Sequence, residues 1–440
     1  MSSHPRSRGP SPLSRRSFLT AAAATGVAAA GLTGLGGCGA PGVAAGKSRV
    51  RQWNLFGGGD GARLIEMNQQ FQDEHPDIEF EAYTLDWGPP FYTKLAMSAA
   101  GGRAPEVATV HLSRLNGLSP GRLLDPIPRD VLAEVGIGED QFLPATWEKC
   151  VVDGELYAIP LDTHPFVMYY NTEICERAGL LGSDGRLVPF SGVDELLEVL
   201  RTVQGVTGAF GASLETTNPW RLWYSLYRQL DGEFFDGTEL IVDDDKAIQV
   251  LTLMLDLARE GLVPTFADYP ACVAMFSNGQ AGLSFNGEWE VTTFVTAELP
   301  FSMAPFPDVY GNIRTCGDAH TFVLPHQRDR DADDTRATLE YVAWMLEHSV
   351  DWAAGGHIPA FQPVAESAEY LALTPQSEYR QVAPEVQFDP EAWFSGSGAL
   401  MQNEAGAAFA GVTSGDLTPE RAWAQFRAAV QKLLDTPSPV

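Results

Sequence analysis

Positive charge is scarce in this 440-residue chain, which holds 29 lysines and arginines against 57 aspartates and glutamates. The formal net charge of −28 gives the protein a strongly negative surface. Such a surface repels phosphate backbones and anionic lipid headgroups, so the composition argues against nucleic-acid binding and against adsorption to a membrane surface. It suits a neutral or cationic small ligand better than a polyanion, and the same charge also promotes solubility.

Cysteine is also rare, with five residues in the chain. Cys38 lies close to the N-terminus, and no two of the others have the spacing of metal ligands. In an oxidising compartment the other four would form two disulfides by one of three connectivities. In a chain this long they are equally consistent with buried free thiols. These four are Cys150, Cys175, Cys272 and Cys316.

The most apolar stretch near the N-terminus is a short segment rich in alanine and glycine, residues 20–36. It is shorter and less apolar than the roughly 20 strongly apolar residues that a membrane span needs. Ser14-Arg15-Arg16-Ser17-Phe18-Leu19 precedes it and resembles a twin-arginine export signal, and Leu35-Gly36-Gly37-Cys38 ends it and resembles a lipobox. We therefore expect an exported protein, anchored by lipid to the outer face of the cell membrane.

The expected processing divides the N-terminal region in two. Residues 1–37 are a twin-arginine lipoprotein signal peptide, and residues 38–48 are the lipidated N-terminus, with Cys38 acylated, and a Gly/Ala/Pro-rich tether. Removal of the signal takes four arginines and no acids with it, which changes the net charge from −28 to −32. The four are Arg6, Arg8, Arg15 and Arg16.

Signatures of common active sites are absent. The sequence has no Gly-x-Ser-x-Gly, His-Glu-x-x-His, Gly-x-x-x-x-Gly-Lys-Ser/Thr or Cys-x-x-Cys motif. Gly57-Gly58-Gly59-Asp60-Gly61 has the position of a dinucleotide-binding loop but not its spacing, so it is interpreted as a ligand contact or a plain turn. We expect no enzyme activity and no cofactor.

Histidine is scarce too, with eight residues, of which four stand in apolar or loop settings: His111, His164, His320 and His357. Their spacing does not support a zinc site, so no metal is expected and a satisfied structural role is favoured. Acidic residues are abundant, and sequence does not show which of them are close in space. A pair of catalytic carboxylates, as in a secreted glycoside hydrolase or lyase, therefore stays open as an alternative.

The body of the chain alternates between strand and helix patterns. Residues 51–56 read as a strand, Asp60 as the N-cap of a helix that His75-Pro76 ends, and residues 78–82 as the next strand. Alternation of this kind predicts an α/β protein with a largely parallel sheet. About 390 residues remain after the signal and tether, which favours two lobes over one.

Tryptophans adjoin polar groups at several expected loop and helix edges. Flat aromatic faces stack on the C–H faces of sugar rings, while carboxylates and amides bind the hydroxyl groups. Taken singly, each of these tryptophans is better explained as part of a hydrophobic core. The segments are Asp86-Trp87, Trp220-x-x-Trp223, Glu288-Trp289 and Trp393-Phe394.

From residue 51 to the C-terminus the chain resembles the family 1 extracellular solute-binding proteins of ABC transporters, the sugar-binding group that includes maltose-binding protein. The order and spacing of several short segments carry the resemblance. They include Trp53-Asn54-Leu55-Phe56-Gly57-Gly58, Phe71-Gln72-Asp73-Glu74-His75-Pro76-Asp77-Ile78, Gly154-Glu155-Leu156-Tyr157-Ala158-Ile159-Pro160, Phe276-Ser277-Asn278-Gly279-Gln280-Ala281-Gly282 and Asn286-Gly287-Glu288-Trp289. Two departures are Pro105-Glu106, where the family often has Pro-Asp, and Glu288, where it commonly has proline.

The resemblance implies a periplasmic-binding-protein-like type II fold, with two α/β lobes joined by crossover strands and a ligand cleft between them. Crossings are expected near residues 161–165, 298 and 346–350. Lobe 1 then holds residues 49–163 and 299–346, and lobe 2 holds residues 164–298 and 347–440.

The implied function is the substrate-binding subunit of an ABC importer, a monomer that delivers a mono- or oligosaccharide to membrane permease subunits. A glycerol-phosphate or polyol ligand and a role in signalling to a receptor are the alternatives within this class. Trp289, with Trp220 or Trp223, is expected to form the stacking platform, and Asp86, Glu288 and Asp162 to accept hydrogen bonds. The candidate ligand-binding residues are Gly58, Asp60, Asp86, Trp87, His111, Asp162, Trp220, Trp223, Glu288, Trp289, His320, His357 and Trp393.

Overall fold

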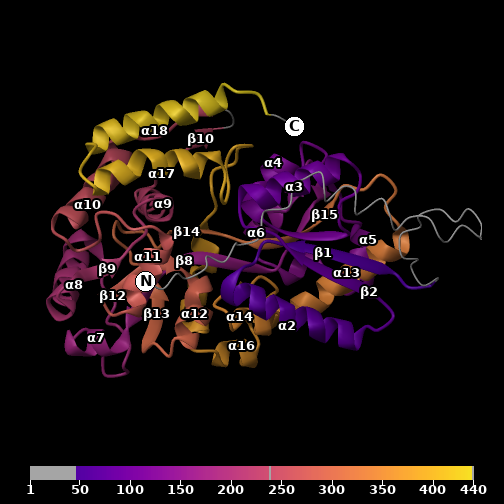
Figure 1. The fold of residues 1–440 in the computed structure, drawn as a ribbon, viewed down its shortest axis with the longest axis horizontal. Coiled ribbons are helices and arrows are strands. Elements are labelled where there is room, and N and C mark those ends of the chain that lie inside the picture. Colours follow the sequence, from indigo (N-terminus) through magenta and orange to yellow (C-terminus); the bar gives the residue numbers. More distant parts are fainter. Residues whose placement is uncertain (1–45, 237–238, 439–440) are drawn as a thin grey trace, which may run out of the picture. The chain divides into compact units, whose positions relative to one another are not determined.

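The computed structural model describes residues 46–236 and 239–438. The expected signal peptide, Cys38 and most of the tether lie outside the described residues. The α/β part of the chain begins at Ser48 and is one compact unit (Figure 1). Within the described ranges, none of the helices has the length and apolar character needed to cross a membrane.

The first sheet has the strand order β2-β1-β3-β15-β4, with β7 also paired to β15. Strand β1 pairs in parallel with β2 and β3, and β15 pairs antiparallel with β3, β4 and β7. The parallel part is what the strand–helix alternation predicts, and β15 joins it from far along the chain. The strands are β1 (Arg49–Asn54), β2 (Glu79–Thr84), β3 (Val107–His111), β4 (Leu124–Asp125), β7 (Ala158–Pro160) and β15 (His320–Pro325).

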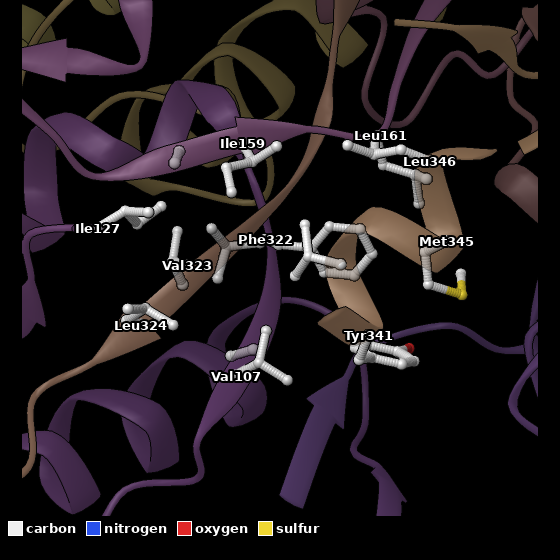
Figure 2. Packing of buried hydrophobic residues seen from close by; sticks show 14 of the residues in the cluster. Val107, Ile127, Ile159, Leu161, Phe322, Val323, Leu324, Tyr341, Met345 and Leu346 are labelled. Carbon is white, nitrogen blue, oxygen red and sulfur yellow. The ribbon is translucent and has the colours of Figure 1, made fainter. Parts of the chain in front are cut away.

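Helices α2 and α13 lie beside this sheet in Figure 1. Figure 2 shows part of the core of this sheet, in which Phe322 of β15 lies toward Tyr341 and Met345 of α13, and Val107 of β3 and Ile159 of β7 belong to the same cluster. The helices that belong to this core or border it are α2 (Gly58–Glu74), α3 (Pro89–Ala100), α4 (Leu115–Leu118), α5 (Arg129–Glu134), α6 (Pro144–Lys149), α13 (Ala332–Glu347), α14 (Ser349–Ala353), α15 (Gln362–Ala365) and α16 (Ala368–Ala372).

The second sheet has the order β17-β14-β8-β12-β9, with β13 and β16 also paired to β8. Its long central strand β8 is buried at every position, which only a strand covered on both faces can be. The strands are β8 (Asp162–Asn171), β9 (Phe210–Ser213), β12 (Ala281–Gly287), β13 (Phe301–Pro305), β14 (Thr315–Asp318), β16 (Ile358–Pro359) and β17 (Val386–Gln387).

The helices of the second part include the C-terminal pair α17 and α18, which lie side by side in yellow in Figure 1. They are α7 (Thr172–Arg177), α8 (Gly192–Thr207), α9 (Trp220–Gln229), α10 (Asp244–Arg259), α11 (Tyr269–Ser277), α12 (Val291–Thr296), α17 (Leu400–Thr413) and α18 (Pro419–Leu434). Two short hairpins, β5 (Val151–Val152) with β6 (Glu155–Leu156) and β10 (Phe235–Asp236) with β11 (Glu239–Leu240), complete the strands of the described residues.

Two of the chain's passages between the two sheets are short junctions. Leu161 separates β7 of the first sheet from β8 of the second, as expected for the crossing near residues 161–165. The return falls at Ala319, between β14 and β15, and not near Glu298, because β13 still pairs with β8. The last passage falls after the expected residues 346–350, since Trp352 of α14 is still buried in the first core.

One helix start differs from the sequence expectation. Helix α2 begins at Gly58 with Gly57 as its N-cap, so Asp60 lies inside the first turn and is not the cap. An acid in the first turn still interacts favourably with the helix dipole. His75 ends the helix as predicted.

The four cysteines Cys150, Cys175, Cys272 and Cys316 are buried free thiols. Of the two alternatives that the sequence left open, the structure therefore has free thiols and not disulfides.

Candidate functional site

A cavity of about 420 Å³ lies where the two sheets meet. The loop after β1, the end of β3 and the start of β15 supply one side, and β8, α9, α12 and β14 supply the other. It is lined by Leu55, Phe56, Gly57, Gly58, Gly59, Asp60, Trp87, His111, His164, Phe166, Arg221, Tyr269, Trp289, Glu290, Thr293, Cys316, Gly317, Asp318, His320, Asp389, Ser397 and Gln402.

Six of the residues chosen from sequence line this cavity: Gly58, Asp60, Trp87, His111, Trp289 and His320. The glycine tract after β1 has a packing reason as well as a place in the lining. A Cβ on Gly59 would stand 2.5 Å from the Cβ of Thr292 on α12. Residue 59, in the first turn of α2, must therefore be glycine for α12 to approach this closely. The roles of these six residues in binding stay predictions.

Two tryptophans face the cavity from opposite parts of the chain. Trp87 is 47% exposed and meets the ring of His111 edge-on. Trp289 is half-buried and rigidly held: its indole nitrogen donates a 2.6 Å hydrogen bond to the Tyr269 hydroxyl, and the Arg221 guanidinium lies 5.2 Å from its ring centre. Trp87 therefore offers the freer aromatic face of the two.

Carboxyl groups outnumber lysines and arginines in the lining. Among the residues that the structure describes, Arg221 is the only lysine or arginine in the lining, and its guanidinium is 3.7 Å from the Glu215 carboxylate. Burial raises the pKa of Asp318 to about 7, although Ser113 and the Ala319 amide donate hydrogen bonds to this carboxyl. Burial likewise raises the pKa of Asp389, which accepts hydrogen bonds from neighbouring side chains. The lining is thus rich in acceptors for hydroxyl or ammonium groups.

A second polar group surrounds Asp162, whose side chain is fully buried. The Nδ1 atoms of His164 and His320 lie 3.0 and 2.7 Å from its two oxygens, and the indole nitrogen of Trp352 donates a 2.6 Å hydrogen bond. Burial alone would raise the pKa of Asp162, but the neighbouring histidines hold it well below its ordinary value. His164 and His320 also line the cavity.

His357 links this group to the lobe boundary. Its Nδ1 lies 3.0 Å from Glu288 and 3.3 Å from Asp162, and its Nε2 lies 3.2 Å from Asp60. Burial lowers the pKa of His357, but these carboxylates outweigh burial and place it well above its ordinary value. Burial raises the pKa of Glu288 to about 7. Asp162, Glu288 and His357 therefore lie behind the lining and not in it.

The structure corrects the expected stacking platform. Trp220 and Trp223 are buried in the second core, at 1% and 0% exposure. Trp220 stacks on Tyr224 at 4.9 Å, and Trp223 stacks on Tyr227 at the same distance. They share one face of α9 as predicted, but that face packs inward, so neither is placed to stack on a ligand in the cavity.

Two further candidates lie outside the lining. Trp393 is half-buried against the second core, and Asp86 is exposed beside Trp87. Sequence reasoning missed several lining residues that come from segments without a motif. Arg221 lies between the two buried tryptophans in the sequence, and Asp318 is the last residue of β14. Polar lining residues that were not among the binding candidates include His164, Arg221, Tyr269, Glu290, Asp318 and Asp389.

Two mixed α/β parts with a ligand-sized cavity at their junction define the class of two-lobed binding proteins. Solved structures with this fold include the GacH receptor of Streptomyces glaucescens, studied unliganded and with acarbose, at TM-score 0.76 and 18% identity over 88% of this chain and 99% of that one. Maltose-bound MalE3 of T. maritima has a TM-score of 0.74 and 17% identity, over 88% of this chain and 99% of that one. The predicted type II fold is confirmed.

Within that class, residues 58–351 match the family described as bacterial extracellular solute-binding protein, and the chain belongs to it. The arabinooligosaccharide-binding protein of Halalkalibacterium halodurans is 26% identical over 196 residues, 44% of this chain and 41% of that protein. The sn-glycerol-3-phosphate-binding periplasmic protein UgpB of Yersinia enterocolitica is 22% identical over 247 residues, which are 53% of this chain and 54% of that protein.

This chain matches about half the length of these curated relatives. The family is one of binding proteins and not of enzymes, which agrees with the expectation of no catalysis. It is also one of extracellular proteins, which agrees with export.

Proposed function

We propose that this protein is the substrate-binding subunit of an ABC importer, and that it captures a mono- or oligosaccharide in the cavity and delivers it to a membrane permease. The observation that carries the proposal is the pairing of Trp87 and Trp289 with buried carboxyl and amide groups in one cavity of about 420 Å³. Aromatic faces for sugar rings and acceptors for hydroxyl groups are the requirements of such a site. Relatives named for sugar oligomers support the same ligand class.

A neutral or cationic sugar is favoured over a phosphorylated ligand. A phosphate needs converging positive charge. In the described part of the lining, Arg221 is the one arginine; it already contacts Glu215 and the Trp289 ring, and Asp318, Asp389 and Glu290 share its cavity. Glycerol phosphate is the second candidate ligand, because some relatives are named for binding sn-glycerol 3-phosphate. A carbohydrate-active enzyme is disfavoured by family membership.

The site of action follows from the N-terminal motifs. The proposed mature protein is a monomer held at the outer face of the cell membrane by lipid on Cys38, where it can meet permease subunits. The twin-arginine pattern and the lipobox support this placement. No nucleic acid and no further membrane contact are part of the proposal.

The test is a thermal-shift screen of the purified protein against sugars, polyols and glycerol phosphates. A ligand at a hundred times its dissociation constant adds about 2.7 kcal/mol to the unfolding free energy, which is a clear shift. Calorimetry of the hits should give one site per chain. Mass analysis of the sugar after long incubation should show it unchanged, and hydrolysis would move the assignment to an enzyme.

A further inference from the structure

Three histidines and one aspartate converge beside the cavity from distant parts of the chain. Asp162 and His164 lie on β8, His320 on β15, and His357 in the turn before β16. Their side chains are 0 to 7% exposed, and one potential ligand atom from each lies within 4.8 Å of those of the other three. Because they span almost half the chain, residue spacing predicts no metal site here.

The histidines direct the same ring atom at one carboxylate. The Nδ1 atoms of His320, His164 and His357 lie 2.7, 3.0 and 3.3 Å from the oxygens of Asp162. Around a tetrahedral zinc ion with bonds of 2.0 to 2.2 Å, neighbouring ligand atoms stand about 3.3 Å apart. The three distances to Asp162 are at most about 0.6 Å below that separation, and the four ligand atoms lie within 4.8 Å of one another, so a shared cation requires changes in their separations of no more than about 1.5 Å.

Negative charge is concentrated around the same point. Asp60 and Glu288 flank His357, and every ion-pair partner found for Asp60, Asp162 and Glu288 among residues 46–236 and 239–438 is a histidine. Buried carboxylates without a compensating cation are strongly unfavourable. A divalent ion bound between the three imidazoles and Asp162 would supply that compensation.

Polar atoms of His357 and of the two carboxylates that flank it also lack hydrogen bonds. Both ring nitrogens of His357, both carboxylate oxygens of Glu288 and one oxygen of Asp60 are buried, and none makes a hydrogen bond of acceptable geometry. Asp162 differs, because Trp352 and the backbone amide of His320 donate to it at 2.6 and 2.8 Å. Such outer hydrogen bonds hold a metal-ligating carboxylate in place.

We propose that Asp162, His164, His320 and His357 bind one divalent transition-metal ion, with Zn²⁺ as the best match. Three imidazole nitrogens and one carboxylate oxygen are the donors that zinc prefers, and the buried site offers no ring of oxygen ligands for calcium or magnesium. The ion ties together β8, β15 and the turn before β16, all of which lie at the junction of the two sheets. It therefore stabilises the floor of the cavity and does not depend on which ligand the cavity takes.

The experiment uses the protein purified with a histidine-free affinity tag and stripped with a chelator. Zn²⁺ alone is then titrated, and we expect one equivalent per chain and a melting temperature raised by several degrees. Co²⁺ in its place should give the intense visible bands of tetrahedral coordination. Binding well below one equivalent, with no thermal shift, overturns the proposal and assigns the group to a network held by a proton on His357.

Variants locate the ion. His320→Ala should lower the zinc affinity at least about tenfold and weaken the cobalt bands, while His326→Ala, which alters a histidine paired with Asp125 outside the group, should change neither. Trp352→Phe removes the outer hydrogen bond to Asp162, keeps an aromatic ring against His357 and should lower the affinity about 10- to 100-fold, so it serves if His320→Ala does not fold. Full zinc binding in both His320→Ala and Trp352→Phe would place the ion elsewhere and overturn the assignment.

Discussion

The indole nitrogen of Trp220 donates a 2.7 Å hydrogen bond to the carboxylate of Asp389. Trp220 is 1% exposed in the second core, whereas Asp389 lines the cavity. Gln402 of α17 donates a second hydrogen bond of 2.7 Å to the other Asp389 oxygen. Trp220, which was predicted to stack on ligand, is therefore a core residue that holds a carboxylate of the cavity lining in position.

Replacement of Trp87 by alanine should weaken sugar binding with little effect on the stability of the unliganded protein. The side chain is 47% exposed and lines the cavity, so its loss removes a stacking face and leaves the core intact. Loss of a buried aromatic contact corresponds to roughly ten- to several-hundred-fold in affinity. Calorimetry and a thermal melt measure the two effects. Tyr83→Ala is the control, because Tyr83 is 48% exposed but outside the lining, and equal losses in both variants would refute the role of Trp87.

Trp289→Ala should also weaken binding, but it should cost more stability than Trp87→Ala. The Trp289 indole is half-buried, donates to the Tyr269 hydroxyl and carries the Arg221 guanidinium over its ring. Its removal takes away a hydrogen bond and a cation–π contact of about 1 kcal/mol each. Denaturant melts of the two variants without ligand compare the costs. An unchanged affinity together with a large loss of stability would make Trp289 a packing residue.

Trp223→Ala should lower the free energy of unfolding and should affect sugar binding only through this loss of stability. Trp223 is fully buried and stacks between Tyr227 and Trp423, so truncation leaves a large void. The expected loss in the free energy of unfolding is about 3–5 kcal/mol. Sugar affinity, measured well below the melting temperature, should stay close to the unaltered value. If the variant were as stable as the unaltered protein but had lost its affinity for sugar, Trp223 would be a ligand-binding residue.

Stability should depend on pH through Glu106 and Arg51. The carboxylate of Glu106 is 3% exposed and accepts two 2.8 Å hydrogen bonds from the Arg51 guanidinium. Burial alone would raise the pKa of Glu106, but the bonds with Arg51 hold it below its ordinary value of 4.5. A carboxyl with a lowered pKa in the folded state stabilises the protein above about pH 4.5, and this contribution is lost as the pH falls through the folded-state pKa.

Glu106→Gln should therefore lower the free energy of unfolding by about 3 kcal/mol at pH 7, because Arg51 is left without its partner. The difference from the unaltered protein should shrink as the pH falls below 4.5. Urea melts at pH 7, 5 and 3.5 test this. A difference that stays constant over that range would show that the charge of Glu106 contributes nothing.

Processing at Cys38 is tested in cells. Cys38→Ala should block processing or release the protein into the medium, because the acyl anchor is lost. Replacement of Arg15 and Arg16 by lysine should stop export. Membrane fractionation and the N-terminal mass of the product are the measurements. A Cys38→Ala protein that is cleaved at the same bond and stays in the membrane fraction would contradict the lipobox.

Local patterns in the sequence were sufficient for the class of fold. Strand and helix alternation from β1 to β3 depends on side-chain periodicity and on breakers such as His75-Pro76, and these act within a few residues. The ordered segments around Gly57, Gly154 and Asn286 indicated the solute-binding family, and residues 58–351 match it. The loop after β1 and Trp289 belong to such segments, and both line the cavity, while their roles in binding stay predictions.

Tertiary structure alone decided which chemically suitable residues share a site. Trp220 and Trp87 are both tryptophans beside polar groups, yet one is packed in a core and the other faces the cavity, because burial depends on what the opposing helices and strands supply. Pairing of β13 with β8 moved the return crossing to Ala319, a choice between partners that strand periodicity does not encode. Asp162, His164, His320 and His357 converge because β8 and β15 meet at the junction of the two sheets, a contact between segments far apart along the chain.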